Sequence, residues 1–229
     1  MNILLTGHRG YIGKSIKKKF SESNYNIKTI TNRITTKSKI NYENIDCVIH
    51  CLNKFNCNNK NDIFKTNYII SKKIFDEIIK VNSKRIKIFI NINTIKIKEN
   101  SNFNNNYYVT SKKKFSCYVE KKTNKKILFI DFLVPTVFGN KGNGKDFYSE
   151  AFVQLKKNKE LKIKSPHISK KFIKINNLTN QVFRFFKKYE NSSKTGYLKI
   201  IANYNFEKTV LEFTNYLKIK LKSKSKISY

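Results

Sequence analysis

The stretch that decides the fold reads Thr6-Gly7-His8-Arg9-Gly10-Tyr11-Ile12-Gly13 and lies close to the start of the chain. It follows the apolar residues 3–5, which indicate a buried strand. Residues 11–20 come next, with apolar side chains at 12, 16 and 20 and lysines between them, a spacing that predicts a helix. The glycines therefore occupy a turn from a strand into a helix, where such a motif indicates a dinucleotide-binding site.

Three of the seven glycines in the chain lie in this turn, and each has a physical role there. Gly7 permits the tight turn, Gly10 lets a pyrophosphate approach the backbone, and Gly13 lets the helix pack closely on the strand. The N–H groups at the helix start, at Tyr11 and Ile12, and the positive end of the helix dipole would then hold the phosphates. A glycine-rich turn without a ligand is the alternative, and the concentration of glycines here disfavours it.

The spacing Gly-x-x-Gly-x-x-Gly with a leading threonine resembles that of the extended short-chain dehydrogenases/reductases, which include nucleotide-sugar epimerases, dehydratases and reductases. The resemblance runs from Asn2 to about Leu217 and is strongest in the first part of the chain. It implies an α/β fold: a Rossmann-type, doubly wound, mostly parallel sheet with a reduced C-terminal substrate subdomain. Residues 1–139 would form the NAD(P)-binding domain, with a returning strand near 197–202. Residues 140–229 would form the small substrate-binding subdomain and a basic tail.

Apolar stretches predict the other strands of this sheet, at residues 26–31, 39–40, 46–51, 86–92 and 127–134. Helices are expected over residues 62–81 and 107–120. His50 is interpreted as a packed strand-end residue rather than a catalyst. Asn67 falls where the family carries an asparagine near its active site. Pro135-Thr136-Val137-Phe138-Gly139 resembles the exit from the sixth strand, whose backbone faces the nicotinamide in the family.

The residues after the second strand bear on the choice between NAD and NADP. NAD-preferring members of the family end this strand with an acidic residue that binds the ribose 2′-hydroxyl, whereas this chain has Thr31, Asn32 and Arg33 there. The guanidinium of Arg33 suits a 2′-phosphate, and Arg9 inside the glycine turn points the same way. We therefore expect NAD(P) as cofactor with a preference for NADP(H). The alternative is that Arg33 is one more exposed cation in a cationic protein.

The expected catalytic residues are Thr94, Tyr108 and Lys112. Tyr108 and Lys112 are one helical turn apart on one face of the helix 107–120, and Thr94 follows the strand 86–92. The resemblance implies that Tyr108 is the acid/base and that Lys112 lowers its pKa from about 10 and also binds the nicotinamide ribose. It implies that Thr94 hydrogen-bonds the substrate oxygen.

Tyrosine–lysine pairs at this spacing are a weak signal in so basic a chain. Four other tyrosines also have a lysine four residues later, so a coincidental helix pair is the alternative. Only the pair at 108 and 112 opens a helix between the fifth and sixth expected strands. Its position in this order is what favours the catalytic interpretation.

The composition bears on partners. The chain has 48 Lys and Arg against 15 Asp and Glu, which gives a formal net charge of +33. The electrostatic field of so positive a protein attracts nucleic acid. The lysines, however, are spread along the chain, as is typical of an AT-rich coding sequence. We expect the field to draw in a nucleotide-linked sugar as substrate. Epimerase or reductase chemistry by hydride transfer is favoured, because the acidic pair of a dehydratase does not follow Thr94.

The alternative to an enzyme is a binding protein without catalytic activity. The charge and the shortened substrate region would also suit a dinucleotide-binding protein that has lost catalysis and acts as an RNA-binding or sensor module. The sequence leaves both hypotheses open.

The remaining features concern metals, location and assembly. The cysteines are Cys47, Cys51, Cys57 and Cys117. No Cys-x-x-Cys pair occurs, so no metal site is expected. The cysteines are expected to be free thiols in a reducing cytoplasm. No signal peptide or apolar stretch of membrane-spanning length is visible, so we expect a cytoplasmic protein with no membrane partner. The resemblance implies a homodimer formed through the helices after Asp62 and Tyr107, although their lysines weaken this expectation.

Overall fold

A computed structural model of the protein describes residues 1–55, 59–80, 85–98, 106–122, 127–139 and 147–229. Cys57 and residues 140–146, where the second domain is expected to begin, lie outside these ranges. The chain divides into two compact units, each with its own hydrophobic core. The first comprises Met1–Val134 and Thr179–Ala202, and the second comprises Pro135–Leu178 and Asn203–Tyr229.

The first unit is built on a six-stranded sheet whose neighbouring strands, as far as the structure describes them, all pair in parallel. The strands are β1 (Asn2–Thr6), β2 (Asn26–Thr29), β3 (Cys47–His50), β4 (Ile88–Thr94), β5 (Leu128–Val134) and β9 (Gly196–Ile201). They lie in the order β2-β1-β3-β4-β5-β9, so the chain reverses its direction of travel across the sheet at β1. This order confirms the Rossmann-type sheet predicted from the sequence, and ligands of such sheets bind at the carboxyl ends of the strands at this reversal.

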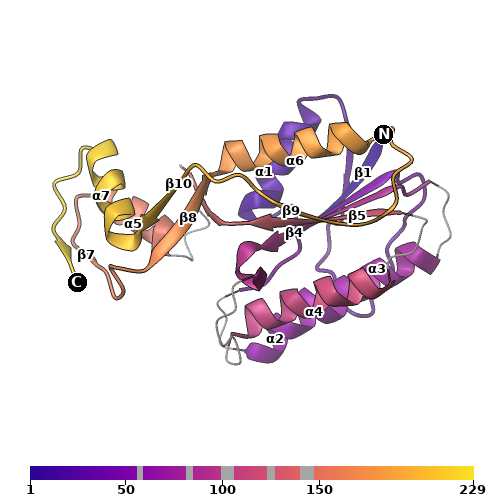
Figure 1. The fold of residues 1–229 in the computed structure, drawn as a ribbon, viewed down its shortest axis with the longest axis horizontal. Helices are drawn as coiled ribbons and strands as arrows, with labels where there is room; N and C mark the ends of the chain where they lie inside the picture. Colours follow the sequence, from indigo (N-terminus) through magenta and orange to yellow (C-terminus); the bar gives the residue numbers. More distant parts are fainter. Residues whose placement is uncertain (56–58, 81–84, 99–105, 123–126, 140–146) are drawn as a thin grey trace. The chain divides into compact units, whose positions relative to one another are not determined.

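Helices cover both faces of this sheet, with α1 and α6 on one face and α2, α3 and α4 on the other (Figure 1). The helical segments are α1 (Tyr11–Ser21), α2 (Lys60–Phe64), η1 (Lys65–Ile70), α3 (Ser71–Lys80), η2 (Ile95–Lys98), α4 (Tyr107–Lys122) and α6 (Ile175–Tyr189). The helices α1 and α6 pack against each other through Phe20 of α1. Its ring contacts the rings of Phe183 and Phe186 of α6 at centroid distances of 5.1 and 5.2 Å. Residues 179–202 thus bring both α6 and β9 back to the first unit.

The helix expected over residues 62–81 is confirmed from Lys60 to Lys80, but its middle part, Lys65–Ile70, is π-helical. A π-helical turn bonds over a longer interval than an α-helical one, and such turns are frequent at functional sites. Asn67 lies within this turn and is buried.

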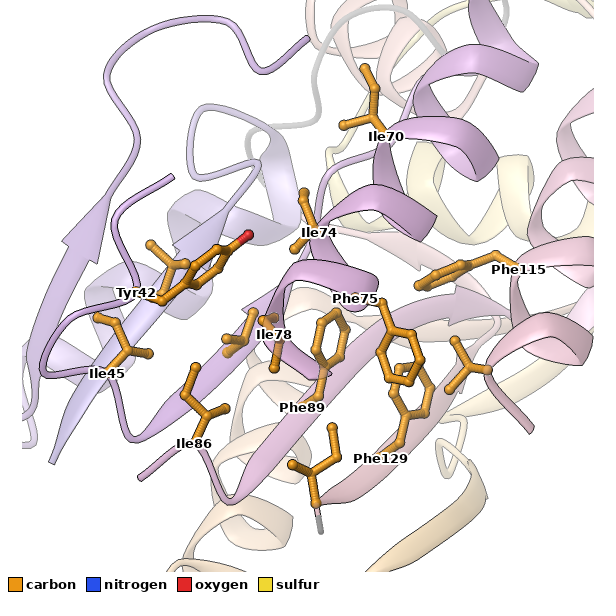
Figure 2. Packing of buried hydrophobic residues seen from close by; sticks show 14 of the residues in the cluster. Tyr42, Ile45, Ile70, Ile74, Phe75, Ile78, Ile86, Phe89, Phe115 and Phe129 are labelled. Carbon is orange, nitrogen blue, oxygen red and sulfur yellow. The ribbon is translucent and has the colours of Figure 1, made fainter. Parts of the chain in front are cut away.

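The core of the first unit lies between the sheet and the helices α3 and α4 (Figure 2). Every residue of β3, β4 and β5 is buried, as expected of parallel strands that are covered on both faces. Phe89 stacks on Phe129 at 4.9 Å, Phe129 stacks on Tyr197 at 5.6 Å, and Phe75 of α3 meets Phe129 edge-on at 5.7 Å. These rings fix α3 against the centre of the sheet.

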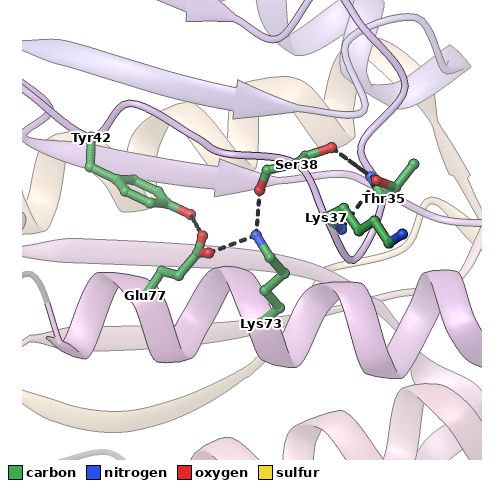
Figure 3. A network of polar contacts seen from close by, with 6 residues as sticks. All are labelled: Thr35, Lys37, Ser38, Tyr42, Lys73 and Glu77. Carbon is green, nitrogen blue, oxygen red and sulfur yellow. Dashed lines mark hydrogen bonds and ion pairs between the residues drawn. The ribbon is translucent and has the colours of Figure 1, made fainter.

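The strand expected at residues 39–40 is wrong: these residues form no strand, and irregular chain connects β2 to β3. Polar contacts with α3 hold this connection in place (Figure 3). The Tyr42 hydroxyl donates to Glu77 Oε2 at 2.9 Å, and Lys73 Nζ lies 2.6 Å from Glu77 Oε1 and donates to the carbonyl of Ser38 at 2.5 Å. These side-chain contacts take the place of a further strand pairing.

The second unit has smaller sheets and a separate core. Its elements are β6 (Thr136–Phe138), α5 (Phe147–Lys156), β7 (Leu161–Lys162), β8 (Ser169–Lys174), β10 (Phe206–Thr209), α7 (Val210–Lys220) and β11 (Ile227–Ser228). The strand β8 lies between β10, which is antiparallel to it, and β6, which is parallel. Phe172 of β8 stacks on Phe213 of α7 at 4.1 Å, and a capping box between Thr209 and Glu212 begins α7.

Replacing Phe89 tests the core of the first unit. We expect Phe89→Ala to lower the free energy of unfolding by about 3–5 kcal/mol, because the ring is fully buried and its stacking partner Phe129 would face a cavity. Urea unfolding followed by circular dichroism measures this. Ile219→Ala is the control, because that side chain is 79% exposed and its loss should change stability by about 0.5 kcal/mol or less. Equal effects of the two substitutions would contradict the assignment of the core.

Candidate functional site

The glycine turn between β1 and α1 is held against the chain that follows β3. Gly7 has a φ of +69°, which favours glycine, and a Cβ there would lie 2.5 Å from the carbonyl carbon and oxygen of Cys51. No side chain fits at this position, since real Cβ contacts are never so short. The N–H of Gly10 closes the turn by donating to the carbonyl of Gly7 at 3.0 Å.

The two other glycines differ in what surrounds them. A Cβ on Gly13 would lie 2.3 Å from the carbonyl oxygen of Gly7, so α1 packs directly on the turn. A Cβ on Gly10 would meet only that same oxygen, at 3.3 Å, and would otherwise point into open space. Gly10 is also the N-cap of α1 and offers no side-chain cap, and the first turn of α1, which begins with Tyr11 and Ile12, contains no acidic residue. The geometry fits the phosphates of a dinucleotide, which bind where backbone N–H groups point outward and no side chain intervenes.

The surroundings of the turn are positively charged. The guanidinium of Arg9 donates to the carbonyl of Thr31, just past the end of β2. Burial, Arg9 and Lys17 all lower the pKa of His8. Asn32, the next residue after Thr31, is exposed, and its expected contact with the cofactor stays a prediction.

Arg33 is also exposed at the end of β2, and neither β2 nor the four residues after it contain a carboxylate. Lys54, and to a smaller extent Arg33, lower the pKa of Asp62 at the start of α2. The guanidinium of Arg33 has no hydrogen-bond partner among the described residues.

Thr94 and the side chain of Lys112 both lie near the carboxyl end of β4, where each has its own hydrogen-bond partner. Thr94 is the last residue of the strand, and its N–H donates to Oδ1 of Asn93 at 2.8 Å. Lys112 is 2% exposed, and its Nζ donates to the carbonyl of Ile92 at 3.0 Å. Burial lowers the pKa of Lys112 to about 8, while Asp131 and Cys51 act in the opposite direction. This ammonium is therefore close to its titration range at neutral pH.

Tyr108 lies near the start of α4 and packs against a small cluster made by Ile97, Val109 and Leu133. Burial raises the pKa of Tyr108 to about 12, and a hydrogen bond from the side chain of Asn53 opposes this rise. Among the described residues, the phenol and the ammonium of Lys112 have different hydrogen-bond partners. The expectation that Lys112 lowers the pKa of Tyr108 below its ordinary value of about 10 is therefore not borne out in this structure, because burial raises this pKa and Lys112 does not contribute to it.

The loop after β3 contacts Tyr108 through Asn53 and Phe55, which are not among the site residues predicted from the sequence. Asn67 fixes this loop from the π-helical turn: its Oδ1 accepts from the N–H of Lys54 and its Nδ2 donates to the carbonyl of Lys54, both at 2.8 Å. Asn53 precedes this clamped residue and contacts Tyr108. Phe55 follows it and meets the Tyr108 ring at 6.1 Å. Leu52 and Asn53 stand where the family usually has small residues after this strand. This departure is the feature of the sequence that could have pointed to the loop.

His50 is enclosed at the end of β3, as expected of a packed strand-end residue. It is 1% exposed, and its two ring nitrogens contact the hydroxyls of Thr6 at 2.8 Å and Ser71 at 2.9 Å. Burial, together with Lys112, lowers the pKa of His50 to about 3, so the ring is neutral at physiological pH.

The residues after β3 join the two halves of the candidate site. The backbone of Cys51 touches the glycine turn, its thiol acts electrostatically on Lys112, and Asn53 contacts Tyr108. Pro135 lies between β5 and β6, where the second unit begins, and its expected contact with the nicotinamide stays a prediction.

The described residues contain neither a membrane-spanning helix nor a cluster of metal-binding side chains. None of the helices there is both long and apolar enough to cross a membrane. In the same part of the chain, no group of three or more His, Cys, Asp or Glu side chains could hold a metal ion.

Comparison with protein families gives one match over most of the chain. A sequence model described as "NAD dependent epimerase/dehydratase family" matches residues 3–167, which include the glycine turn and all three expected catalytic residues. None of the curated proteins compared with the sequence matches it significantly.

Solved structures resemble the whole chain at low sequence identity. MoeE5 in complex with UDP-glucose and NAD has a TM-score of 0.83 and 11% identity, with 100% of this chain and 85% of that chain covered. UDP-N-acetylglucosamine 4-epimerase from Bacillus cereus has a TM-score of 0.80 and 15% identity, with coverage of 100% and 84%. RMD from Pseudomonas aeruginosa, complexed with NADPH, has a TM-score of 0.78 and 12% identity, with coverage of 99% and 86%. At these identities the likeness shows the fold.

The contact between Asn53 and Tyr108 yields a prediction. Asn53→Ala should raise the pKa of Tyr108, because the amide hydrogen bond favours the phenolate and burial then acts unopposed. The measurement is a pH titration of ring-labelled tyrosine by ¹³C NMR, with Tyr108→Phe identifying the signal. Asn32→Ala, an exposed asparagine for which no contact with the phenol is seen, is the control. An unchanged or lower pKa in Asn53→Ala would contradict the contact.

Proposed function

Because the chain belongs to the NAD dependent epimerase/dehydratase family, we propose that it catalyses hydride transfer at a carbon of a nucleotide-linked sugar, with NADP(H) as the favoured cofactor. Epimerase or keto-sugar reductase chemistry is proposed in preference to dehydration. The observation that carries the proposal is the loop after β3, which contacts both the glycine turn and Tyr108. A phosphate-binding turn and an acid/base candidate thus share one edge of the sheet.

The residues proposed to hold the cofactor are those of the turn and of the strand ends around it. Gly7, Gly10 and Gly13 give its diphosphate access to the backbone at the start of α1, where Tyr11 and Ile12 begin the helix. Asn32 and Arg33 lie where the adenine ribose is bound in sheets of this type, with Arg9 beside them. Lys112 and Pro135 are proposed to contact the nicotinamide half. When bound, the cofactor accepts or donates the hydride.

Tyr108 is proposed to move the proton that accompanies hydride transfer. With its pKa raised to about 12 the phenol is protonated at neutral pH, so it can donate to a sugar carbonyl oxygen. The reverse direction needs the phenolate, which the hydrogen bond from Asn53 favours. The positive charge of Lys112 is proposed to favour it as well once substrate and cofactor are bound. Thr94 is proposed to orient the substrate oxygen from the end of β4.

The proposed substrate class rests on the structural neighbours and on charge. MoeE5 binds UDP-glucose, and the Bacillus cereus enzyme is a UDP-N-acetylglucosamine 4-epimerase. A net charge of +33 favours anionic ligands such as nucleotide sugars. The second unit is proposed to be the substrate-binding subdomain. A cytoplasmic homodimer is proposed as the working form.

Replacing Tyr108 tests the proposed chemistry. Tyr108→Phe should lower kcat by about 10²–10⁴-fold, the range for loss of a general acid/base, while cofactor affinity stays unchanged. The neighbouring Tyr107→Phe is the matched control, because Tyr107 is 39% exposed and Ser111, not a lysine, stands four residues later. Turnover is measured with UDP-, GDP- and dTDP-sugars, and cofactor binding by nicotinamide fluorescence. Full activity of Tyr108→Phe would overturn the assignment.

Replacing Arg33 tests the cofactor preference. Arg33→Ala should weaken NADP⁺ binding about tenfold or more and leave NAD⁺ binding unchanged, because only NADP⁺ has the 2′-phosphate that a guanidinium can bind. Arg184→Ala is the control, since Arg184 is an exposed arginine on α6 and its loss changes the net charge equally. Titration calorimetry measures both affinities. Equal losses for the two cofactors would show that Arg33 acts only through the general field.

The alternative function, an RNA-binding or sensor module without catalysis, is supported by the charge alone. It predicts the opposite outcome in the same assays. No nucleotide sugar would be turned over, and a gel shift with RNA would persist at physiological salt.

A further inference from the structure

Asn93, the residue before Thr94, carries a buried amide that the proposed chemistry does not use. It lies in β4 and is 3% exposed, so its polar atoms need partners inside the protein. Its Nδ2 donates to Ser116 Oγ at 2.7 Å and to Asp131 Oδ1 at 2.9 Å. Its Oδ1 accepts the N–H of Thr94 at 2.8 Å. Both ends of this amide are therefore occupied.

Asp131 determines which way the amide of Asn93 points. It is 0% exposed in β5, and it also accepts hydrogen bonds from Ser116 Oγ at 2.7 Å and from the Tyr197 hydroxyl at 2.8 Å. These partners can all donate, as an ionised carboxylate requires, because it can only accept. Hydrogen bonds to a carboxylate are stronger than neutral ones, so the NH₂ end of the amide turns toward Asp131. The oxygen end is left to face the N–H of Thr94.

The same contacts join the end of β4 to α4. Ser116 lies one helical turn after Lys112, and its Oγ is 3.2 Å from the carbonyl oxygen of Lys112. Ser116, Lys112 and Asn93 are each 3% exposed or less. Asn93 is therefore a buried link between the strand that ends at Thr94 and the helix that carries the two other expected catalytic residues.

Thr94 is held from two sides at the carboxyl end of β4. Besides the hydrogen bond from its N–H, its Oγ1 accepts a long hydrogen bond from the N–H of Lys96 in η2, at 3.4 Å. Within the part of the chain that the structure describes, no acceptor faces the hydroxyl proton of Thr94. A hydroxyl whose oxygen is engaged by the protein can donate this proton to a substrate oxygen, which is the role proposed for Thr94.

We propose that Asn93 is a positioning residue of the active site: its amide, oriented by Asp131 and Ser116, holds the backbone of Thr94 and thereby fixes the direction of the Thr94 hydroxyl. The catalytic importance of this arrangement rests on the proposed function. The hydrogen bond itself belongs to the folded chain and can be tested without cofactor or substrate.

The same strand contains a matched control for Asn93. Asn91 lies two residues earlier, so its side chain is on the same face of β4, and it is also fully buried. Its Nδ2 donates to Asp131 Oδ1 at 2.9 Å, the distance found for Asn93. Its Oδ1, however, has no hydrogen-bond partner among the described residues, so Asn91 holds no backbone group. The two asparagines therefore share the carboxylate and differ in the contacts with Thr94 and Ser116.

Amide hydrogen exchange of Thr94, followed by NMR without ligands, tests the hydrogen bond. Asn93→Ala should speed this exchange about fivefold or more, the factor expected when an N–H loses one hydrogen bond. Asn91→Ala should not. The other amides of β4 serve as the reference in each variant, because a general loss of stability would speed all of them together. Equal acceleration of Thr94 by the two substitutions, relative to this reference, would overturn the proposal.

Ser116→Ala separates the two contacts that distinguish the asparagines. It removes the contact of Asn93 with α4 and leaves the contacts with Asp131 and Thr94. We expect it to speed the exchange of Thr94 less than Asn93→Ala does. An equal effect would show that the link to α4, rather than the amide oxygen, holds Thr94, which contradicts the proposal.

Two further measurements apply should the alanine variants fail to fold. Leucine at each of the two asparagine positions fills the space of the amide and avoids a cavity, and the same difference in exchange is expected. In the unmodified protein, a scalar coupling between the Thr94 nitrogen and the side-chain carbonyl carbon of Asn93 should report the hydrogen bond directly. Absence of this coupling would rule the hydrogen bond out.

Kinetics separate this proposal from the proposed function. In an active enzyme, Asn93→Ala should lower kcat about tenfold or more and leave NADP(H) affinity unchanged, because a displaced group at the substrate slows the chemical step. Asn91→Ala should keep nearly the wild-type kcat. Equal losses of kcat in the two variants would overturn the positioning role. Wild-type protein that binds no NADP(H) and turns over no nucleotide sugar would sink the proposed function, while the exchange of Thr94 would still decide whether Asn93 holds it.

Discussion

The close contact between the glycine turn and the end of β3 is the constraint on which the rest of the site depends. A Cβ on residue 7 would lie only 2.5 Å from the backbone carbonyl of Cys51, so residue 7 must be glycine for the turn to pack against the end of β3. Gly13 repeats the same constraint between the turn and α1. Because the chain after Cys51 continues into the loop that contacts Tyr108, fixing the glycine turn also restrains its distance from the acid/base candidate.

Much of the fold could be predicted from the sequence, since strands covered on both faces are continuous apolar runs. The strands β3, β4 and β5 are of this kind, and their order followed from the parallel, doubly wound rule. The connection between β2 and β3 could not be predicted, because its conformation depends on contacts with Lys73 and Glu77, more than thirty residues away. The π-helical turn around Asn67 was hidden for a similar reason: the apolar spacing of the long helix does not reveal a local change of hydrogen bonding.

The candidate site divides in the same way. Glycines in a turn and a tyrosine four residues before a lysine are local patterns, so the sequence could indicate Gly7, Tyr108 and Lys112. In the sequence, Asp131 is only a charged residue that interrupts an apolar strand. Its hydrogen-bond donors come from β4, α4 and β9, and the sequence does not show that these elements meet at Asp131. The polar residues behind a site have no spacing of their own, since each is placed by the pairing of a different strand or helix.

The irregular chain that replaces a further strand has a consequence for association. The sheet ends at β2, whose outer backbone groups form an open edge of the kind that templates pairing with another chain. This strand is only four residues long, and Lys28 is an exposed cation within it. Lys28 also donates to the carbonyl of Glu43 in the connection to β3. A short, charged and partly shielded border protects the protein against the edge-to-edge aggregation that a longer apolar margin would invite.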